Sequence, residues 1–394
     1  MTKRKANIAK TAFGFVLVIG IVNLFADMAY EGGRSIAGPF MGSLGASATI
    51  VGFVAGFGEL LGYAFRSVSG YFADKFQRYW YFVFPGYLIN VFAVPALALA
   101  GNWQIAAVLI IAERTGRAIR KPVVDAMISY AGKSIGRGWV FGLNEGLDQA
   151  GAAISPLIVA FVLYYRGGYR AGFAVLLIPA ILCLATLVVA RFWYPRPHEL
   201  ETDSADFSTA ESFPKAFWIY VAAGALIAAG FADFSLIAFH FQKAAVVSPT
   251  TIPLFYAVAM GAGALTNLGF GRLFDRVGFP IAIFAFFLGA LFAPLVFLGQ
   301  FWLSLIGMVL WGIGMGAQNS LLKALLTGVL AVEKRGTGFG FFYTGYGIAW
   351  FLGSAAMGYL YDKSIVAVVI FSVVFQLLAL PVFLSARGLV RSAS

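Results

Sequence analysis

The chain contains 394 residues, of which 61% are hydrophobic and 11% are charged, and its mean hydropathy is +0.86. Soluble globular proteins carry about 25% charged residues, so the composition excludes an ordinary soluble protein and indicates an integral membrane protein. The formal net charge of +11 falls mainly at the termini and in short loops, a distribution that does not indicate a nucleic-acid-binding protein.

Apolar runs long enough to cross a bilayer, roughly 18 residues or more, recur along the whole length. Because they lack the polar and apolar alternation of barrel strands, they predict an all-α fold. The first run is expected to be retained as a helix, since no cleavage site and soluble domain follow it. The sequence predicts twelve transmembrane helices at 12–39, 47–72, 79–100, 103–130, 137–165, 171–194, 214–241, 251–273, 279–299, 302–328, 336–360 and 364–386.

Lysines and arginines are distributed unevenly between the two sets of loops. Most of the 28 lie at the termini and in the loops that follow even-numbered spans, whereas the other loops hold Arg166, Arg170, Lys243 and Lys363. Positive residues gather on the cytoplasmic side of membrane helices. The pattern predicts a multi-pass protein of the inner or plasma membrane with both termini in the cytoplasm.

The two halves of the chain resemble each other. "RGWVFG" at 137–142 corresponds to "RGTGFG" at 335–340, and "FAD" occurs at both 25–27 and 231–233. Each match occupies the same ordinal place in its half, which predicts two six-helix repeats. A polar, acidic segment lies between them. We therefore expect bundles at 1–194 and 214–394, joined by a cytoplasmic linker at 195–213.

The segment "GYFADKFQR" makes the chain resemble the major facilitator superfamily of secondary transporters, and the resemblance extends over essentially the whole chain. The motif residues here are Gly70, Asp74, Lys75 and Arg78, with Gln77 where the family usually has a second glycine; Asp275 and Arg276 repeat the acid and base in the second half. The resemblance implies transport by alternating access between two six-helix bundles. It also implies that these motif residues form a cytoplasmic gate.

A second family pattern is found only in part. Exporters of the superfamily often carry Gly, three residues, and Gly-Pro in the fifth span, where this chain has Gly151, Ser155 and Pro156. The arginine that accompanies this pattern in the fourth span is replaced by Ala112. The resemblance therefore favours export by antiport slightly, and import by symport stays the alternative.

Charged residues inside the predicted spans are the candidate functional residues. Charges in lipid are costly, about 2.5–3.5 kcal/mol each on insertion scales, and usually line a cavity or pair with each other. Those in the first half are Asp27, Glu31, Arg34, Glu59, Arg66, Glu113, Arg114, Arg117, Glu145 and Asp148. Helical spacing places four sets of residues each on one helix face: Asp27, Glu31 and Arg34; Glu113, Arg117 and Arg120; Glu145, Asp148 and Gln149; and Glu59 and Arg66. Asp27, Glu59, Glu113 and Glu145 are expected near mid-depth. Arg120, Lys121 and Asp125 are expected near the cytoplasmic end of their helix, where their side chains can extend towards water.

The second half offers fewer candidates. Under the repeat, Asp233 corresponds to Asp27 and His240 to Arg34, while Tyr343 and Tyr346 are expected to form an aromatic wall for an organic substrate. His240 is also a candidate proton site. The alternative for all these residues is a structural one, in which ion pairs only hold the helices in register.

These patterns predict a proton-coupled transporter of a small organic solute, with protons and the lipid bilayer as its other partners and the monomer as its expected state. Arg34, Arg66, Arg114 and Arg117 offer binding partners for an anionic substrate, which is the case for symport. No phosphate-binding loop, metal-ligand cluster or cofactor motif is found in the sequence. An enzyme is therefore not expected, and a non-transporting receptor of the same fold is the alternative from a different class.

Overall fold

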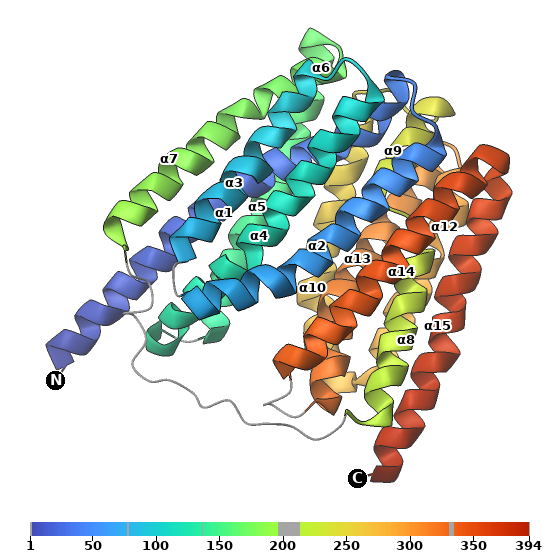
Figure 1. Ribbon diagram of the computed structural model, residues 1–394. Coiled ribbons are helices and arrows are strands. Elements are labelled where there is room, and N and C mark those ends of the chain that lie inside the picture. Colours follow the sequence, from blue (N-terminus) through green and yellow to red (C-terminus); the bar gives the residue numbers. More distant parts are fainter. Residues whose placement is uncertain (1, 77–78, 136, 196–212, 331–334, 394) are drawn as a thin grey trace. The chain divides into compact units, whose positions relative to one another are not determined.

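The computed structural model describes residues 2–76, 79–135, 137–195, 213–330 and 335–393, and these residues form helices and no strands (Figure 1). The elements in chain order are α1 (Thr2–Ser43), α2 (Ala48–Phe76), α3 (Tyr79–Ala96), η1 (Leu97–Leu99), α4 (Trp103–Ile135), α5 (Arg137–Arg166), α6 (Tyr169–Val175), α7 (Leu177–Trp193), α8 (Lys215–Gly230), α9 (Phe234–Lys243), α10 (Ile252–Val277), α11 (Phe279–Ala290), α12 (Phe292–Leu298), α13 (Phe301–Val329), α14 (Arg335–Lys363) and α15 (Ile365–Ala393).

Every predicted span corresponds to helix, and four spans are divided into two elements. The divided spans are α3 with η1, α6 with α7, α8 with α9, and α11 with α12. The first span differs from expectation at its end. It was expected to end at residue 39, but α1 continues to Ser43 with Pro39 inside the helix.

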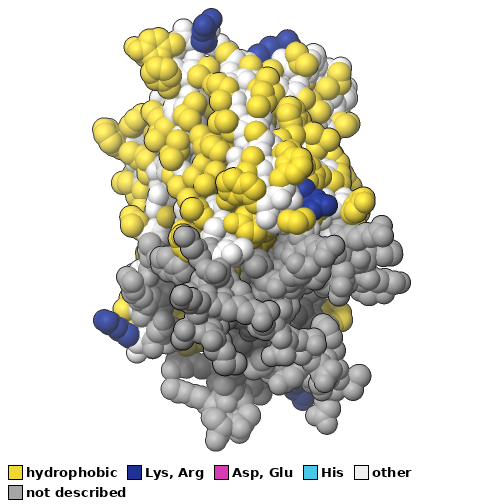
Figure 2. Space-filling model, turned by 90° about the vertical axis from the view of Figure 1, so that its left-hand side faces the viewer, with side chains coloured by type: hydrophobic (Ala, Val, Ile, Leu, Met, Phe, Trp, Pro, Cys, Tyr) yellow, Lys and Arg dark blue, Asp and Glu magenta, His cyan; other side chains and the backbone are white. Residues whose placement is uncertain are grey.

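Nine stretches of helix within the described ranges are long and apolar enough to cross a membrane by length and composition, and Ile252–Asn267 is a shorter apolar one. The helix α4 is not among the nine because charged residues interrupt its apolar run. The described part of the surface in Figure 2 consists mostly of hydrophobic side chains. Ile178, Ile181 and Phe192 of α7, for example, are 60%, 53% and 79% exposed, as expected for a helix that faces lipid.

The internal contacts divide the chain into two units, which we call unit 1 and unit 2. Unit 1 contains Met1–Arg34 and Leu61–Asp206, and unit 2 contains Ser35–Leu60 and Phe207–Ser394. The boundaries therefore cut α1 after Arg34 and α2 after Leu60. The expected bundles at 1–194 and 214–394 stay a prediction, and the contacts group residues 35–60 with the second unit.

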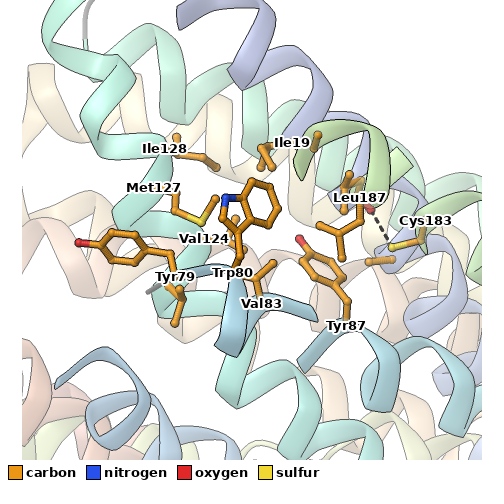
Figure 3. Packing of buried hydrophobic residues seen from close by; sticks show 14 of the residues in the cluster. Ile19, Tyr79, Trp80, Val83, Tyr87, Val124, Met127, Ile128, Cys183 and Leu187 are labelled. Carbon is orange, nitrogen blue, oxygen red and sulfur yellow. Dashed lines mark hydrogen bonds between the residues drawn. The ribbon is translucent and has the colours of Figure 1, made fainter. Parts of the chain in front are cut away.

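A hydrophobic cluster fills unit 1 where α1, α3, α4 and α7 meet (Figure 3). Trp80, Met127 and Leu187 are among its buried side chains. The buried Cys183 lies in this cluster with its Sγ 3.4 Å from the carbonyl oxygen of Val22. The cluster holds the helices that carry the charged residues described below.

Glycines bring two pairs of helices of unit 1 into backbone contact. A Cβ added at Gly116 of α4 would lie 2.7 Å from the carbonyl oxygen of Gly86 in α3, and one added at Gly151 of α5 would collide with the carbonyl oxygen of Leu24 in α1. Such close approach requires residues without side chains. It places polar side chains of α1, α3, α4 and α5 within reach of one another.

In unit 2, the first half of α2 packs against the last half of α14. A Cβ added at Gly52 would collide with the carbonyl oxygen of Ser354, and one added at Gly358 would collide with the carbonyl oxygen of Ala48. The carboxylate of Asp362 accepts hydrogen bonds from the backbone N–H groups of Ala48 (3.2 Å) and Thr49 (2.9 Å) and from the Thr49 hydroxyl (2.6 Å). We call these three bonds the α2 cap, because two of them satisfy N–H groups that are free at the helix start.

Candidate functional site

The charged and polar side chains of unit 1 form a network between α1, α3, α4 and α5. Arg120 of α4 lies at its centre and is 1% exposed. It donates to Asn23 (3.1 Å) and Asn90 (3.0 Å), and its Nη2 lies 3.5 Å from a carboxylate oxygen of Asp27. Its guanidinium also lies over the ring of Tyr87, 4.4 Å from the ring centre. The expectation that Arg120 extends towards water at a helix end is therefore wrong.

A second ion pair joins α4 to α5. Lys121 Nζ lies 3.3 Å from Oδ2 of Asp148 and 3.6 Å from Asp125. The same Oδ2 lies 3.4 Å from the side-chain amide of Asn144, which in turn accepts a hydrogen bond from Asn23 of α1 at 2.7 Å. The other oxygen of Asp148, Oδ1, is buried and has no hydrogen-bond partner among the described residues.

Glu113 of α4 interacts with neighbours on two sides. Its Oε1 accepts from the amide of Asn90 at 2.7 Å, and its Oε2 lies 3.4 Å from Nε of Arg114. Both charged side chains are almost fully buried, so the pair is shielded from solvent in unit 1. Burying such charges is expensive unless they are paired and hydrogen-bonded.

Three arginines surround Tyr30 of α1, and we call these four residues the Tyr30 cluster. Arg34 donates to the phenolic oxygen at 3.1 Å, and Arg114 donates to the same oxygen. The guanidinium carbons of Arg117, Arg114 and Arg34 lie 4.1, 4.9 and 6.0 Å from the ring centre. The cluster therefore collects three positive charges around one neutral ring.

The other acids predicted in the first half lie in different surroundings. Glu31 is 8% exposed, next to the Tyr30 cluster in sequence. Glu145 is exposed and accepts a hydrogen bond from Gln149 at 3.1 Å. Glu59 is half-buried and belongs to unit 2. Glu145 thus does not share the deep burial of Asp27 and Glu113.

Two candidates of the second half bond to neighbours in unit 2. Asp233 caps α9 by accepting from the backbone N–H of Ser235 at 2.8 Å. His240 is 2% exposed, and its Nδ1 lies 2.9 Å from the hydroxyl of Tyr361. Asp233 therefore has a role in helix capping that its sequence counterpart Asp27, inside a continuous helix, does not have.

The two tyrosines predicted as an aromatic wall lie on α14. The hydroxyl of Tyr346 donates to Gln318 at 2.5 Å, and its ring is 5.8 Å from that of Trp350. Tyr343 is half-buried beside the ring of Phe342. These rings belong to a larger aromatic cluster with Phe231 and Trp311, so aromatic packing is a feature of this region as a whole.

Several predicted residues lie outside the described side chains. They are Arg66, Gly70, Asp74, Lys75, Arg78 and Asp275. Of the motif residues, the side chain of Arg276 is described and is exposed at the end of α10.

Neutral polar residues of the network are absent from the sequence predictions, which considered charged residues. Asn23, Asn90, Asn144 and Tyr87 each form a hydrogen bond with a network residue of another helix. Asn23 and Asn144 each precede a network aspartate by four residues, so they share its helix face, and this spacing was the available signal. Among the described residues, no group of three or more His, Cys, Asp or Glu side chains is placed to hold a metal ion.

Comparisons with known proteins agree with this architecture. The sequence profile of the Major Facilitator Superfamily matches residues 19–354 and 234–392. An uncharacterized protein of Mycobacterium tuberculosis (strain H37Rv) is 37% identical over 385 residues, which cover 96% of this chain and 94% of that protein. An uncharacterized MFS-type transporter of Methanocaldococcus jannaschii is 26% identical over 364 residues, covering 89% of each chain.

Solved structures of transporters share the fold. A peptide transporter matches with a TM-score of 0.76 at 14% identity, covering 98% of each chain. A nucleoside transporter matches with a TM-score of 0.75 at 13% identity, covering 95% of this chain and 98% of that one. The profile match, the relatives and the helical fold lead to one conclusion: this chain belongs to the major facilitator superfamily and is a multi-pass membrane transporter of small molecules, not an enzyme.

Proposed function

We propose that the chain is a proton-coupled secondary transporter of a small organic solute, and that the network of unit 1 takes part in binding both solute and proton. The observation that carries this proposal is the environment of Asp148. Its Oδ2 bonds to Lys121 and Asn144, while its Oδ1 is buried without a hydrogen-bond partner among the described residues. A proton on this carboxylate would weaken the ion pair that links α5 to α4.

The pairing pattern gives this step a mechanical consequence. Asp148 connects to Lys121 on α4 directly and to Asn23 on α1 through Asn144. Changing its charge therefore changes the contacts of three helices together. Alternating access requires such a link between an ion and the arrangement of helices. Buried pairs that only hold helices in register are the competing explanation, and the experiment below separates the two.

Two directions of transport are candidates. The segment Gly151–Pro156 favours export in exchange for protons, through its resemblance to the exporter pattern. The Tyr30 cluster favours import of an anion together with protons, because it supplies three guanidinium groups near several carboxylates. The proposal places both termini in the cytoplasm, with the motif at 70–78 as a gate and the monomer as the functional unit.

The experiment uses purified protein in proteoliposomes with an imposed pH gradient. Solutes that cross in a gradient-dependent manner are identified by mass spectrometry from a metabolite mixture, and the direction of their flux relative to the proton gradient distinguishes symport from antiport. Asp148→Asn is expected to lose gradient-driven flux while retaining exchange of labelled for unlabelled solute. Asp125→Asn is the matched control, because Asp125 also pairs with Lys121 but is 40% exposed.

Full gradient-driven flux in Asp148→Asn would exclude this residue as the coupling acid. If an imposed pH gradient moves no solute through the wild-type protein while a sodium gradient does, proton coupling itself is wrong. Loss of flux in both the Asp148→Asn and the Asp125→Asn variant would indicate that the two ion pairs of Lys121 serve only to stabilise the structure.

A further inference from the structure

We propose that Arg120 acts on Asp148 through two side-chain amides, which hold the carboxylate of Asp148 as a hydrogen-bond acceptor. The amides are those of Asn23 and Asn144, and we call them the amide relay. The relay sets the pH at which Asp148 takes up a proton and directs that proton to Oδ1. This inference rests on the proposed function, because Asp148 is the acid assigned there to coupling. It adds two positioning residues and the atom that binds the proton.

The orientation of the first amide follows from its neighbours. A guanidinium group carries only donors, so the atom of Asn23 that lies 3.1 Å from Nη1 of Arg120 must be its oxygen, Oδ1. The hydroxyl of Tyr87 donates to the same oxygen. The NH₂ group of Asn23 therefore points away from Arg120 and is available to a residue of α5.

The second amide is oriented by the first. Nδ2 of Asn23 lies 2.7 Å from Asn144, and because it is a donor, the atom that it meets is the oxygen of Asn144. The NH₂ group of Asn144 then faces Oδ2 of Asp148, at 3.4 Å. Turning either amide over would bring two donors together at one of its ends and two acceptors together at the other. The relay therefore has a single direction, from the cation of Arg120 to the carboxylate of Asp148.

This direction decides where Asp148 can bind a proton. Oδ2 accepts from Asn144 and also from Nζ of Lys121, at 3.3 Å. A proton on Oδ2 would meet both of these donors. Oδ1 is buried and has no hydrogen-bond partner among the described residues, so a proton on Oδ1 displaces no hydrogen bond. Oδ1 is therefore the atom that takes up the proton.

The relay acts alongside charged groups that surround Asp148. Those that act on it electrostatically are Asp27 of α1, Arg120 and Lys121 of α4, and Glu145 of α5. Hydrogen bonds to a carboxylate favour its ionised form, so loss of the relay should favour the protonated form. Replacing a relay asparagine by leucine keeps the branched shape of the side chain and changes none of these charges. Leucine variants therefore isolate the contribution of the relay.

The test follows Asp148 directly, by infrared difference spectroscopy of the purified full-length protein in lipid vesicles as the pH is changed. The C=O stretching band of the protonated carboxyl group is identified as the band that Asp148→Asn removes. The intensity of this band gives the pH of half-protonation, and its frequency reports the hydrogen bonds that the carbonyl oxygen accepts. Neither quantity depends on transport.

Asn144→Leu should raise the pH of half-protonation by about one unit, as for loss of one hydrogen bond to a charged group. The band should also move to higher frequency, because Oδ2 loses a donor. Asn23→Leu should raise this pH as well, although Asn23 does not contact Asp148, because the amide of Asn144 is then free to turn. Gln149→Leu is the matched control and should change neither quantity, because Gln149 follows Asp148 in sequence but donates to Glu145.

A pH of half-protonation that is the same in both leucine variants and in wild type would overturn the relay. The proposed function would stand in that case if Asp148→Asn still loses gradient-driven flux. An effect of Asn144→Leu without any effect of Asn23→Leu would overturn the role of Arg120. The expected shifts in a protein that shows no proton-driven flux would support the relay and overturn proton coupling alone. If the leucine variants fail to fold, Asn23→Ala and Asn144→Ala decide by the same measurements.

Discussion

Replacing Asp362 by Asn should release the start of α2 from α14. The carboxylate accepts three hydrogen bonds through its two oxygens, whereas an asparagine amide offers one oxygen and turns an NH₂ group towards the donors of Ala48 and Thr49. Each such bond contributes about 1 kcal/mol net, and the exposure of Asp362 reduces this through solvent screening. We expect a loss of about 1–2 kcal/mol, or a factor of about 5–30 in the equilibrium between packed and separated helices.

The assay is the rate of maleimide labelling of a single cysteine buried between the two helices. Ser354→Cys supplies it, since Ser354 is 2% exposed and lies against Gly52 and Gly56 of α2. Cys183→Ser removes the natural cysteine. Asp362→Asn should raise the labelling rate by the same factor of about 5–30, and Lys363→Gln, next to it on the exposed helix end, should leave the rate unchanged.

The pH dependence of this contact has a defined sign. Asp362 lies just beyond the membrane span expected at 336–360. Burial raises the pKa of its carboxyl group, but hydrogen bonds from Thr49 and Ala48 lower it by more, so that the pKa is below its ordinary value. The contribution of the carboxylate is therefore complete above the ordinary pKa of about 3.9 and is lost only as the pH falls through the lowered value. Between pH 5 and 8, labelling corrected for maleimide reactivity should be constant. An unchanged rate in Asp362→Asn, or a rise in wild type between pH 6 and 5, would refute the reasoning.

Three further outcomes follow from unit 1. Arg120→Met should lower the free energy of unfolding by about 3–5 kcal/mol, because it leaves Asp27 buried without its cation. Adding Asp27→Asn should restore part of this stability, as measured by unfolding in SDS. Equal losses in the single and double variants would contradict this expectation. Gly151→Ala should lower the free energy of unfolding by about 1–3 kcal/mol, because its Cβ would collide with Leu24. Gly146→Ala should leave the stability unchanged, since the space around Gly146 is open. Thermal melting compares the two variants. Asn144→Ala should lower gradient-driven flux by removing the link from Asp148 to Asn23, and normal flux would show that this link is dispensable.

The sequence was sufficient to predict helix at all twelve spans, because most of them are apolar runs long enough to cross a bilayer. It did not predict the breaks inside four of them. The break before α9 had a local signal, since Asp233 precedes Phe234 and Ser235 in the manner of a helix N-cap. The repeat obscured this signal, because the equivalent "FAD" at 25–27 lies within the continuous α1.

The candidate site was predicted only in part, and the reason is geometric. Position along a helix gives the depth of a residue, but the rotation of the helix decides what its side chain meets. Asp27 and Glu113 bond within the network, whereas Glu145, expected at a similar depth, is exposed. Arg120 was assigned to the helix end by the same argument from depth, although Gly86 and Gly116 allow α3 to approach and bury it. Contacts of this kind depend on both helices and cannot be read from either one.

The assignment of residues 35–60 to unit 2 affects how the protein can be divided experimentally. A fragment that begins after the linker, at residue 214, would contain α9 and α14 but not the segments of α1 and α2 that cover them. Ser235 and Ser354 would lose their contacts with Gly38 and Gly52, and Asp362 would lose the donors of the α2 cap. The carboxyl-terminal half would therefore be an incomplete folding unit, and a split version of this protein should be cut elsewhere or co-expressed with its amino-terminal fragment.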